Sequence, residues 1–285
     1  MTSTISLKTP FKWSWRSCLS ACAVFCFSVP PALAEDSALQ ALDTWGSNRG
    51  WEAVGLLAIA GQSTCTGVMI RSDLVLTAAH CLYDIDNAKM IDPRKIEFRA
   101  GWRGGRSVAK RFGKSAIIHS GFANGSSANG DQIRNDIGLL QLFDQIPTTH
   151  ADPFRTSGGV ATGNAVSVVS YGAGRNSTPS LQRRCEVLET LKGLVAMSCD
   201  VAPGSSGSPV FAIEQGRPRI VSVVSSLGSV DGNKVSYGMD LRKPLDELMA
   251  DFRAGRGVFP AVSFAARKIG VGNSRELDGA LFLRP

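Results

Sequence analysis

Charged residues are scarce in this chain of 285 residues: Asp, Glu, Lys and Arg make up 19%, whereas 44% of the residues are hydrophobic. A disordered protein would carry more charge and fewer large apolar side chains, so the composition excludes that class. Internal repeats and low-complexity blocks are absent, and 30 Gly with 13 Pro argue against a long helical array. After Ala34, no apolar segment is long enough to span a membrane, so we expect a soluble mature protein.

The segment 1–34 differs from the rest because it holds Lys8, Lys12 and Arg16 but no acidic residue. An apolar stretch, 18–29, follows the basic residues, and then come two prolines and Ala32-Leu33-Ala34. This order is typical of a secretory signal peptide that is cleaved after Ala34. We therefore expect the protein to be secreted or periplasmic.

A membrane anchor and a lipid anchor are the alternatives for this segment. The apolar stretch is shorter than the roughly 20 residues that span a bilayer, and prolines end it. Leu19-Ser20-Ala21-Cys22 resembles a bacterial lipobox, but only a few apolar residues precede Cys22. The pattern favours cleavage and release.

Cleavage would turn an odd cysteine count into an even one. Three of the seven cysteines lie in the leader, which leaves Cys65, Cys81, Cys185 and Cys199. An even count in an exported chain favours two disulfides. Structural zinc sites use C-x2-4-C pairs, which the remaining cysteines do not form, so we expect no metal.

The net charge of +7 also belongs to the precursor, because the leader contributes three basic residues and no acidic one. The mature chain keeps +4, and its basic residues are scattered along the sequence. Such a mild charge gives little reason to expect nucleic acid as a partner.

For the oligomeric state, we expect a monomer.

Many short apolar segments, often β-branched, are separated by clusters of Gly, Asn, Asp and Ser such as 121–131 and 228–233. Strands at this density favour an all-β barrel or sandwich. The predicted strands are Val54–Ala60, Gly67–Ile70, Leu74–Leu76, Lys95–Ala100, Ser115–Ile118, Gly138–Phe143, Ala165–Ser170, Glu186–Leu191, Pro209–Ile213 and Ile220–Ser225.

One helix is predicted near the end, over 244–257. Pro244 suits the first turn of a helix, and glycines at its far end favour termination there. Its apolar residues recur at i, i+3, i+4 and i+7: Leu245, Leu248, Met249 and Phe252. The remaining segment, 258–285, has apolar patches without a clear period, and its role stays open.

His80 is the first candidate for chemistry, at the end of Asp73–Cys81, which reads D-L-V-L-T-A-A-H-C. A lone histidine is usually structural, and the other two are His119 and His150. His80 differs because small residues precede it and a cysteine that can fix its backbone follows. That arrangement suits a rigidly held general base.

Asp136 is the second candidate, because it directly precedes the apolar segment Ile137–Leu140. Most aspartates at such a place cap a turn, and Asp131 competes from a polar Gly/Asn-rich loop. Asp136 is preferred because its neighbours draw it toward a core, where a carboxylate needs a partner such as histidine.

The third candidate segment is Cys199–Val210, in which a Gly-Ser-Ser-Gly-Ser-Pro turn precedes an apolar strand. Glycines let backbone N–H groups point inward, so a serine there can present its hydroxyl beside main-chain donors. Taken alone, an ordinary Gly/Ser turn is the simpler interpretation, because a serine hydroxyl is inert without a base.

T-A-A-H-C, N-D-I-G-L-L and G-S-S-G-S-P, in the order His–Asp–Ser, resemble the chymotrypsin/trypsin-like serine endopeptidases. The resemblance covers about 51–252, and the Cys65 segment, C-T-G-V-M-I, resembles the family's C-G-G-S-L-I. It implies an all-β fold of two six-stranded antiparallel β-barrels with a C-terminal helix. After an N-terminal segment, 35–50, the barrels would occupy 51–150 and 151–243, with the active site between them.

The resemblance also implies a role for each candidate. Ser206 would be the nucleophile, His80 the general base and then acid, and Asp136 the residue that orients His80. The N–H groups of Gly204 and Ser206 would form the oxyanion hole. Ser226-Leu227-Gly228 resembles the family's S-W-G, which pairs with the substrate backbone. Polypeptides would be the substrates, and no cofactor is implied.

For the disulfides, the family pairs the cysteines around its histidine, which implies Cys65 with Cys81. Cys185 and Cys199 then remain as the second pair, although this pair has no simple counterpart in the related branch.

The chain departs from the digestive members of the family before the nucleophile. Those members have Asp at this place, which pairs with an N-terminal amine freed by activation, whereas this chain has Ser205 and no I-V-G-G-like start. We therefore expect no such activation switch. G-S-S-G-S-P looks closer to the bacterial V8-like, or glutamyl endopeptidase, branch, whose motif is G-x-S-G-S-P.

Substrate preference stays open at this point. Asp200 lies where trypsin has its Lys/Arg-reading aspartate, but glutamate-cleaving relatives can carry Asp there too. Their Thr and His match Val201 and Ser225, which suit a buried carboxylate poorly. Gly228 leaves room at the pocket wall, so Lys/Arg or apolar side chains remain candidates.

Two other functions compete with a secreted serine endopeptidase that works through an acyl-enzyme. A catalytically inactive, protease-like binding protein of the cell envelope would usually lack a triad residue, whereas all three types are present. An envelope quality-control protease would carry a PDZ domain after the barrels, and the segment after the predicted helix is too short for one.

Overall fold

The computed structural model describes residues 37–59, 63–84, 86–122 and 130–257. The predicted signal peptide and the 258–285 segment lie outside these residues. In the described ranges, no helix is long and apolar enough to cross a membrane.

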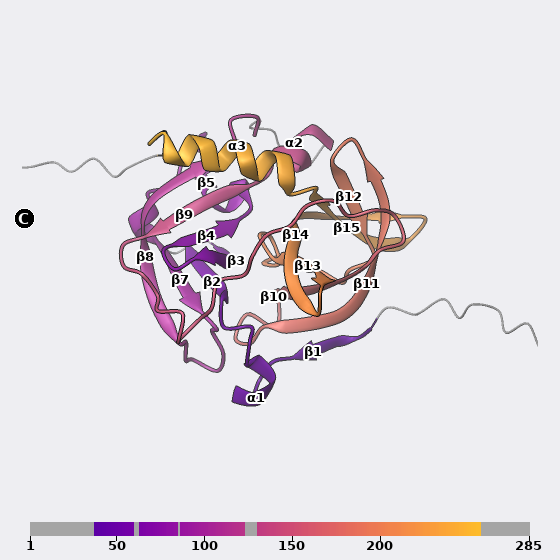
Figure 1. The fold of residues 1–285 in the computed structure, drawn as a ribbon, viewed down its shortest axis with the longest axis horizontal. Coiled ribbons are helices and arrows are strands. Elements are labelled where there is room, and N and C mark those ends of the chain that lie inside the picture. The colour runs from indigo at the N-terminus through magenta and orange to yellow at the C-terminus, as the bar shows by residue number, and fades with distance from the viewer. Residues whose placement is uncertain (1–36, 60–62, 85, 123–129, 258–285) are drawn as a thin grey trace, which may run out of the picture. The chain divides into compact units, whose positions relative to one another are not determined.

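Six antiparallel strands close into a first barrel in the order β2-β3-β4-β9-β8-β7 (Figure 1). In β7 the side chains alternate between interior and surface, with Ile96, Phe98 and Ala100 buried, whereas β4 is buried at all four positions. A strand with this period of two has one apolar face inside the barrel, and a strand such as β4 is covered on both faces. The strands are β2 (Val54–Ile59), β3 (Ser63–Arg71), β4 (Leu74–Thr77), β7 (Ile96–Ala100), β8 (Ala109–Ile118) and β9 (Gly138–Leu142).

Six further antiparallel strands follow the order β11-β10-β13-β14-β15-β12, and pairing of β12 with β11 closes them into a second barrel. A short additional strand, β1 (Leu39–Ala41), pairs with β11. The strands are β10 (Ala165–Ser170), β11 (Ser180–Leu191), β12 (Leu194–Met197), β13 (Pro209–Glu214), β14 (Arg217–Val230) and β15 (Asn233–Met239). The predicted chymotrypsin-like fold of two six-stranded barrels is confirmed.

Several shorter elements lie outside the two barrels. β5 and β6 form a two-stranded sheet, and a short helix, α2, precedes β9. These elements are β5 (Tyr83–Asp84), β6 (Lys89–Met90), α1 (Trp45–Asn48), α2 (Gly130–Asn135), and the 3-10 turns Ala79–Cys81 and Pro93–Lys95.

In the second barrel, β10 has its predicted bounds, whereas β11 and β14 extend well beyond theirs. β11 begins at Ser180 rather than Glu186, and β14 continues to Val230. β12 and β15 were absent from the predicted set. Polar residues on the solvent face interrupt the apolar runs of these strands, and a turn at Lys192-Gly193, where both residues have positive φ, separates β11 from the short β12.

The C-terminal helix α3 covers Arg242–Arg253. It overlaps the predicted range 244–257, but it begins before residue 244 and ends before residue 257. Its end is explained by Gly255, which has a φ of 71°, a left-handed conformation that stops helices. Leu245 and Leu248 are buried in the core that the first barrel also lines, and Figure 1 shows α3 across that barrel's strands. The helix that follows the second barrel in sequence therefore packs on the first.

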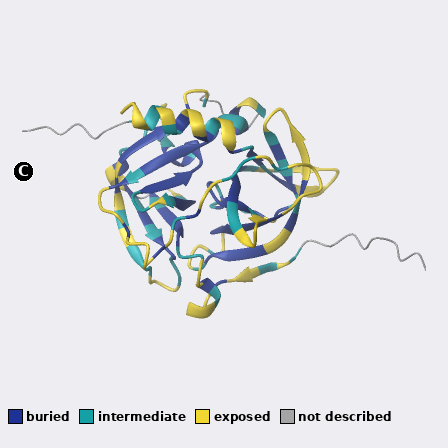
Figure 2. Ribbon diagram, in the orientation of Figure 1, coloured by how far each residue is buried: buried dark blue, intermediate teal, exposed yellow. Residues whose placement is uncertain are grey.

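Aromatic side chains join the two barrels. Phe154, in the connection between them, lies 4.7 Å from Phe211 of β13 and 5.7 Å from Trp51 beside β2, measured between ring centroids. All three rings belong to or pack against one core, which continues from the first barrel into the second. Figure 2 shows the buried residues running along the strands and the exposed ones on turns and on the outer side of α3. Apolar burial therefore stabilises the docking of the barrels.

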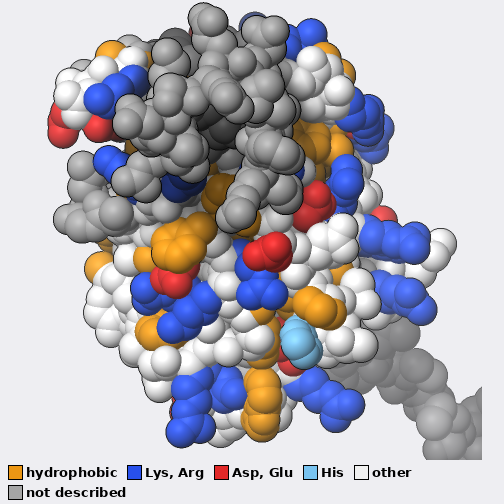
Figure 3. Space-filling view, turned by 90° about the vertical axis from the view of Figure 1, so that its left-hand side faces the viewer, with side chains coloured by type: hydrophobic (Ala, Val, Ile, Leu, Met, Phe, Trp, Pro, Cys, Tyr) orange, Lys and Arg blue, Asp and Glu red, His pale blue; other side chains and the backbone are white. Residues whose placement is uncertain are grey.

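The surface of the first-barrel side has no single charged patch in the view of Figure 3. Lys and Arg side chains lie in several places there, with acidic and apolar side chains between them. This agrees with the scattered basic residues of the sequence.

Both expected disulfides are present. Cys65 of β3 is bonded to Cys81, in the 3-10 turn after β4, and Cys185 of β11 is bonded to Cys199. Each bond links segments of one barrel, and neither joins one barrel to the other.

Candidate active site

His80 lies in the 3-10 turn Ala79–Cys81, directly after β4. Its backbone N–H donates to Oδ1 of Asp136 over 2.9 Å, and its ring Nδ1 lies 2.7 Å from Oδ2 of the same carboxylate. Because a carboxylate can only accept, Nδ1 carries the proton, and Nε2 is left as an acceptor. The disulfide at Cys81 holds the backbone of this turn to β3.

Asp136 lies between helix α2 and strand β9, and only 3% of its surface is exposed. Besides the two donors of His80, it accepts a hydrogen bond of 2.6 Å from the hydroxyl of Ser225 on β14. Three donors satisfy a carboxylate that burial would otherwise destabilise. The carboxylate therefore binds groups from both barrels.

Asp136 also sets the acidity of the histidine. Burial lowers the pKa of His80, but the hydrogen bond to Asp136 and the negative charge of its carboxylate together raise it by more. The pKa of His80 therefore lies above its ordinary value of 6.5. The ring is still reachable, since 28% of the side chain is exposed.

The Gly-Ser turn is fastened to strands of both barrels. The carbonyl of Ser206 accepts a hydrogen bond of 2.8 Å from the N–H of Thr66 on β3, and the Thr66 hydroxyl donates to the carbonyl of Gly204. On the other side, the N–H of Gly207 donates to the carbonyl of Val224 on β14. These contacts fix the backbone on either side of Ser206.

Gly207 shows how closely this turn approaches the histidine segment. A Cβ on Gly207 would lie 2.1 Å from the hydroxyl of Thr77 and 3.0 Å from the backbone nitrogen of Ala78. Its φ of 80° is a second reason why only glycine fits. Ser206, the preceding residue, therefore lies at the junction where the His80 segment meets β14. Within the described structure, no hydrogen bond joins the Ser206 hydroxyl to the His80 ring.

Two backbone donors of the turn are unoccupied. Among the described residues, neither the N–H of Gly204 nor that of Ser206 has a hydrogen-bond partner, although the N–H groups of Ser205, Gly207 and Ser208 all donate to carbonyls. Gly204 reaches this geometry with a φ of 95°. Two free N–H groups beside a serine hydroxyl can receive an oxyanion.

Ser205 is completely buried, and its hydroxyl donates to the carbonyl of Tyr171 over 2.9 Å. The same oxygen accepts from the N–H of Ala202, and the guanidinium of Arg175 lies 3.4 Å away. Arg175 also donates to Ser170 over 2.8 Å. Burial lowers the pKa of Arg175, against the charge of Asp200. A neutral, satisfied hydroxyl thus stands where the digestive relatives have an acid.

A cavity of about 240 Å³ opens beside the turn. Its walls are mostly apolar or backbone: Cys199, Val201, Ala202, Pro203, Leu227, Gly228, Lys234 and Val235. Of the predicted substrate-binding residues, Val201 and Gly228 line it, whereas Asp200, Ser225 and Ser226 are not among its lining residues. Asp200 is half exposed and pairs with Lys234 at 3.7 Å.

Several site residues were not foreseen in these roles. Ser225 binds Asp136 instead of lining the substrate cavity, and Arg175 and Thr66 support the serine turn. These contacts join residues far apart in the sequence, so no local motif marks them.

The sulfur atoms of Cys65 and Cys81 lie near the ring of His80, a grouping that could suggest a metal site. Both sulfurs are committed to a disulfide. They therefore offer no thiolate ligand.

The fold and this arrangement define a class, the serine endopeptidases. The family described as trypsin-like peptidase domain matches residues 65–219, and the chain belongs to this family. No curated protein matches the sequence.

Solved structures resemble the chain in fold. A Glu endopeptidase in complex with MPD has a TM-score of 0.63 and 16% identity, covering 78% of this chain and 98% of its own. A thermostable serine protease, AL20, from an extremophilic microorganism has a TM-score of 0.58 and 16% identity, covering 70% and 97%. The chain thus spans nearly the full length of both proteins.

The titration of His80 tests the geometry directly. By NMR, its pKa is expected above 6.5 in the wild type. In Asp136→Asn, it is expected below 6.5, because the charge that raises the pKa is gone and the effect of burial remains.

The matched control is Asp131→Asn, which removes an acid that bonds Arg134 rather than His80 and should leave the titration unchanged. An Asp136→Asn protein that folds and titrates at or above the wild-type midpoint would contradict the assigned contact.

Proposed function

We propose that the chain hydrolyses peptide bonds through a triad of Ser206, His80 and Asp136. The observation that carries the proposal is the buried carboxylate of Asp136, which bonds Nδ1 of His80 at 2.7 Å beside the serine turn. This bond selects the tautomer in which Nε2 can take a proton. The free N–H groups of Gly204 and Ser206 supply the second requirement, an oxyanion hole.

The proposed proton path runs from Ser206 through His80. As the Ser206 oxygen attacks the substrate carbonyl, its proton moves to Nε2 of His80, and the imidazolium is stabilised by Asp136. The carbonyl oxygen, now negative, binds in the oxyanion hole. His80 then protonates the leaving amine, which leaves an acyl-enzyme, and water releases the acyl group by the same steps. Because only the neutral ring accepts a proton, activity falls as pH decreases through the raised pKa of His80.

Ser206→Ala is expected to lower kcat by about 10⁶-fold, since the other triad members cannot act without the nucleophile. It should also abolish labelling by a phosphonyl fluoride probe, and circular dichroism should show an unchanged fold. Ser229→Ala, a control at an exposed serine of β14, should keep both activity and labelling. If folded wild-type protein is not labelled, the enzyme proposal fails and an inactive binding protein remains.

The cavity beside the turn supports a preference for an apolar side chain before the cleaved bond. A Lys or Arg side chain would need a buried acid, but the carboxylate of Asp200 is half exposed and does not line the cavity. A glutamate would need a buried cation, but the ammonium of Lys234 belongs to a side chain that is 82% exposed and already pairs with Asp200. Apolar walls therefore fit apolar substrates best.

A peptide library should show cleavage after apolar residues. Gly228→Val fills the cavity wall and should lower kcat/KM for large apolar residues by at least about 10-fold, because the lost side-chain burial amounts to a few kcal/mol. Phosphonyl fluoride labelling should persist in this variant, so a loss of specificity can be told from a loss of the nucleophile. Preferred cleavage after Lys, Arg or Glu would refute the assignment.

The G-S-S-G-S-P motif, together with the likeness in fold to a Glu endopeptidase, supports placing the chain near the V8-like branch. A preference for glutamate is not carried over from that branch, because the cavity offers no buried partner for a carboxylate.

The proposal also includes export of the protein, with cleavage of the segment 1–34. Two disulfides suit an oxidising compartment, and the segment 1–34 has the order of a signal peptide. The intact mass of protein recovered outside the cytoplasm should correspond to a chain that begins at Glu35. Ala34→Arg, which replaces the small residue at the cleavage site, should leave the precursor uncut. Exported protein that keeps the segment 1–34 would contradict the proposal.

A further inference from the structure

A second cavity, of about 410 Å³, lies away from the serine turn. Four segments that are distant in sequence form it: the end of α2, the connection between the barrels at Gly159, the turn between β11 and β12, and the start of α3 with the residue Asp240 before it. Its volume falls in the range of small-molecule sites. No residue of the proposed triad or of the substrate cavity lines it.

The charged residues that line this cavity, here called the basic pocket, are mainly cations: Arg134, Lys192, Arg242 and Lys243, against Asp240 and Glu247. The surplus of positive charge contrasts with the mixed charges on the surface in Figure 3. No acidic residue lies in the first turn of α3, so the positive end of the helix dipole adds to this surplus.

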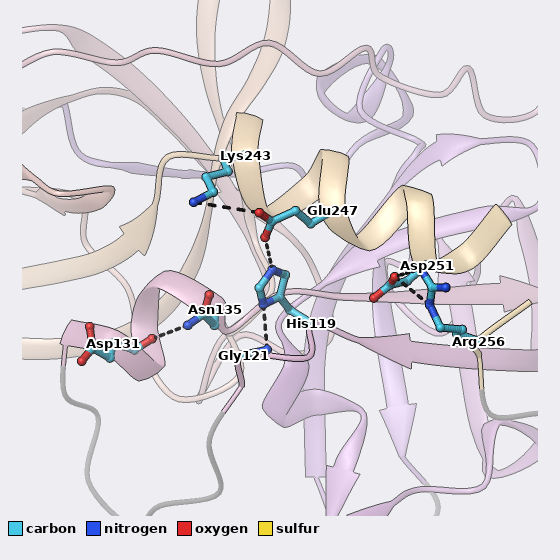
Figure 4. A network of polar contacts seen from close by, with 8 residues as sticks. All are labelled: His119, Gly121, Asp131, Asn135, Lys243, Glu247, Asp251 and Arg256. Atoms are coloured by element: carbon cyan, nitrogen blue, oxygen red, sulfur yellow. Dashed lines mark hydrogen bonds and ion pairs between the residues drawn. The ribbon is translucent and has the colours of Figure 1, made fainter. Parts of the chain in front are cut away.

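The acids of the pocket are occupied by other donors. Glu247 accepts from Nε2 of His119 over 2.8 Å and lies 3.9 Å from Lys243, as Figure 4 shows. The N–H of Gly121 donates to Nδ1 of His119, which places the proton on the nitrogen that faces Glu247. Asp240 accepts from the backbone N–H of Arg242. Both acids keep their negative charge, so the four cations and two acids of the pocket leave a surplus of two positive charges.

The cations are only partly compensated. Lys192 has no ion-pair partner among the described residues, and the exposed guanidinium of Arg242 bonds the carbonyl of Gly158 rather than an acid. Arg134 pairs with Asp131, whose side chain is 90% exposed, so water screens that pair. The buried Nε of Arg134 has no partner in the described structure. Unpaired N–H donors and like charges around one hollow favour an anion between them.

We propose that the basic pocket binds a small oxyanion that carries two or more negative charges, such as a phosphate or diphosphate group. Arg and Lys side chains make charge-assisted hydrogen bonds to such groups. Because the cavity is larger than one phosphate needs, diphosphate should bind more tightly than phosphate. The pocket is separate from the peptide-hydrolysing site, so the proposal does not depend on the triad.

The location gives the anion a structural role. Arg134 and Asn135 end α2, and the chain continues directly into Asp136, whose N–H donates to the carbonyl of Ile133 within α2. The side chain of Arg134 lies close to the β11–β12 turn, since a Cβ added to Gly193 would lie 3.9 Å from Cδ of Arg134. An anion held by Arg134, Lys192 and Lys243 would tie α2 of the first barrel to the β11–β12 turn of the second.

Isothermal titration calorimetry of the wild type with sodium phosphate and with sodium diphosphate, at constant ionic strength, tests the proposal. We expect saturable binding of one diphosphate per chain, with weaker binding of phosphate. Lys192→Asn and Lys243→Gln should each weaken binding by about 10-fold, because each removes one charged hydrogen-bond donor. Asn is chosen at Lys192 because that residue has a φ of 50°, which Asn tolerates.

Lys114→Gln is the matched control, since it removes an exposed lysine of β8 and should leave the affinity unchanged. The amide resonances of Gly159 and Gly193, which line the pocket, should shift on titration and locate the anion there. Heats no larger than those of sodium chloride, or equal affinity in the Lys192→Asn/Lys243→Gln double variant, would overturn the proposal. Binding that shifts only the Gly204 and Ser206 amides would place the anion in the oxyanion hole and would overturn it too.

Discussion

The buried carboxylate of Asp136 is the contact on which the rest of the site depends. It accepts two hydrogen bonds from His80 of the first barrel and one from Ser225 of the second. Removing water from a carboxylate is costly unless donors replace it, so the barrels must dock in one way for this charge to be stable. The same requirement that fixes the docking also orients the imidazole and raises its pKa.

The serine turn also contains a buried polar group that needs hydrogen-bond partners, but this group carries no charge. Ser205 is buried but neutral, and its hydroxyl finds partners in Tyr171, Ala202 and Arg175. In the digestive relatives, the acid at this place requires a newly formed ammonium group. The partners of Ser205 are residues of the second-barrel side of the chain, and the absence of an activation switch stays a prediction.

Sequence patterns were informative where a local rule applies. The apolar alternation of segments such as Lys95–Ala100 and Pro209–Ile213 predicted barrel strands, and the family motifs led to residues that the structure brings together. Patterns were less informative where solvent-facing polar residues interrupt a strand, as in β11, and for the short strand β12. The contacts of Ser225 and Arg175 depend on the packing of distant segments, so no spacing along the chain could reveal them.

The two disulfides have a consequence for how the molecule comes apart. Each one crosslinks segments inside a single barrel, whereas the chain itself passes between the barrels three times, between β1 and β2, through Phe154, and between β15 and α3. The groups of the site, however, are drawn from both barrels and meet through hydrogen bonds and apolar contacts. A slight separation at this seam would therefore part Ser225 and the Ser206 turn from the His80–Asp136 pair while both crosslinked barrels stay folded. The arrangement of the site therefore depends on the docking of the two barrels, and it would be lost before either barrel unfolds.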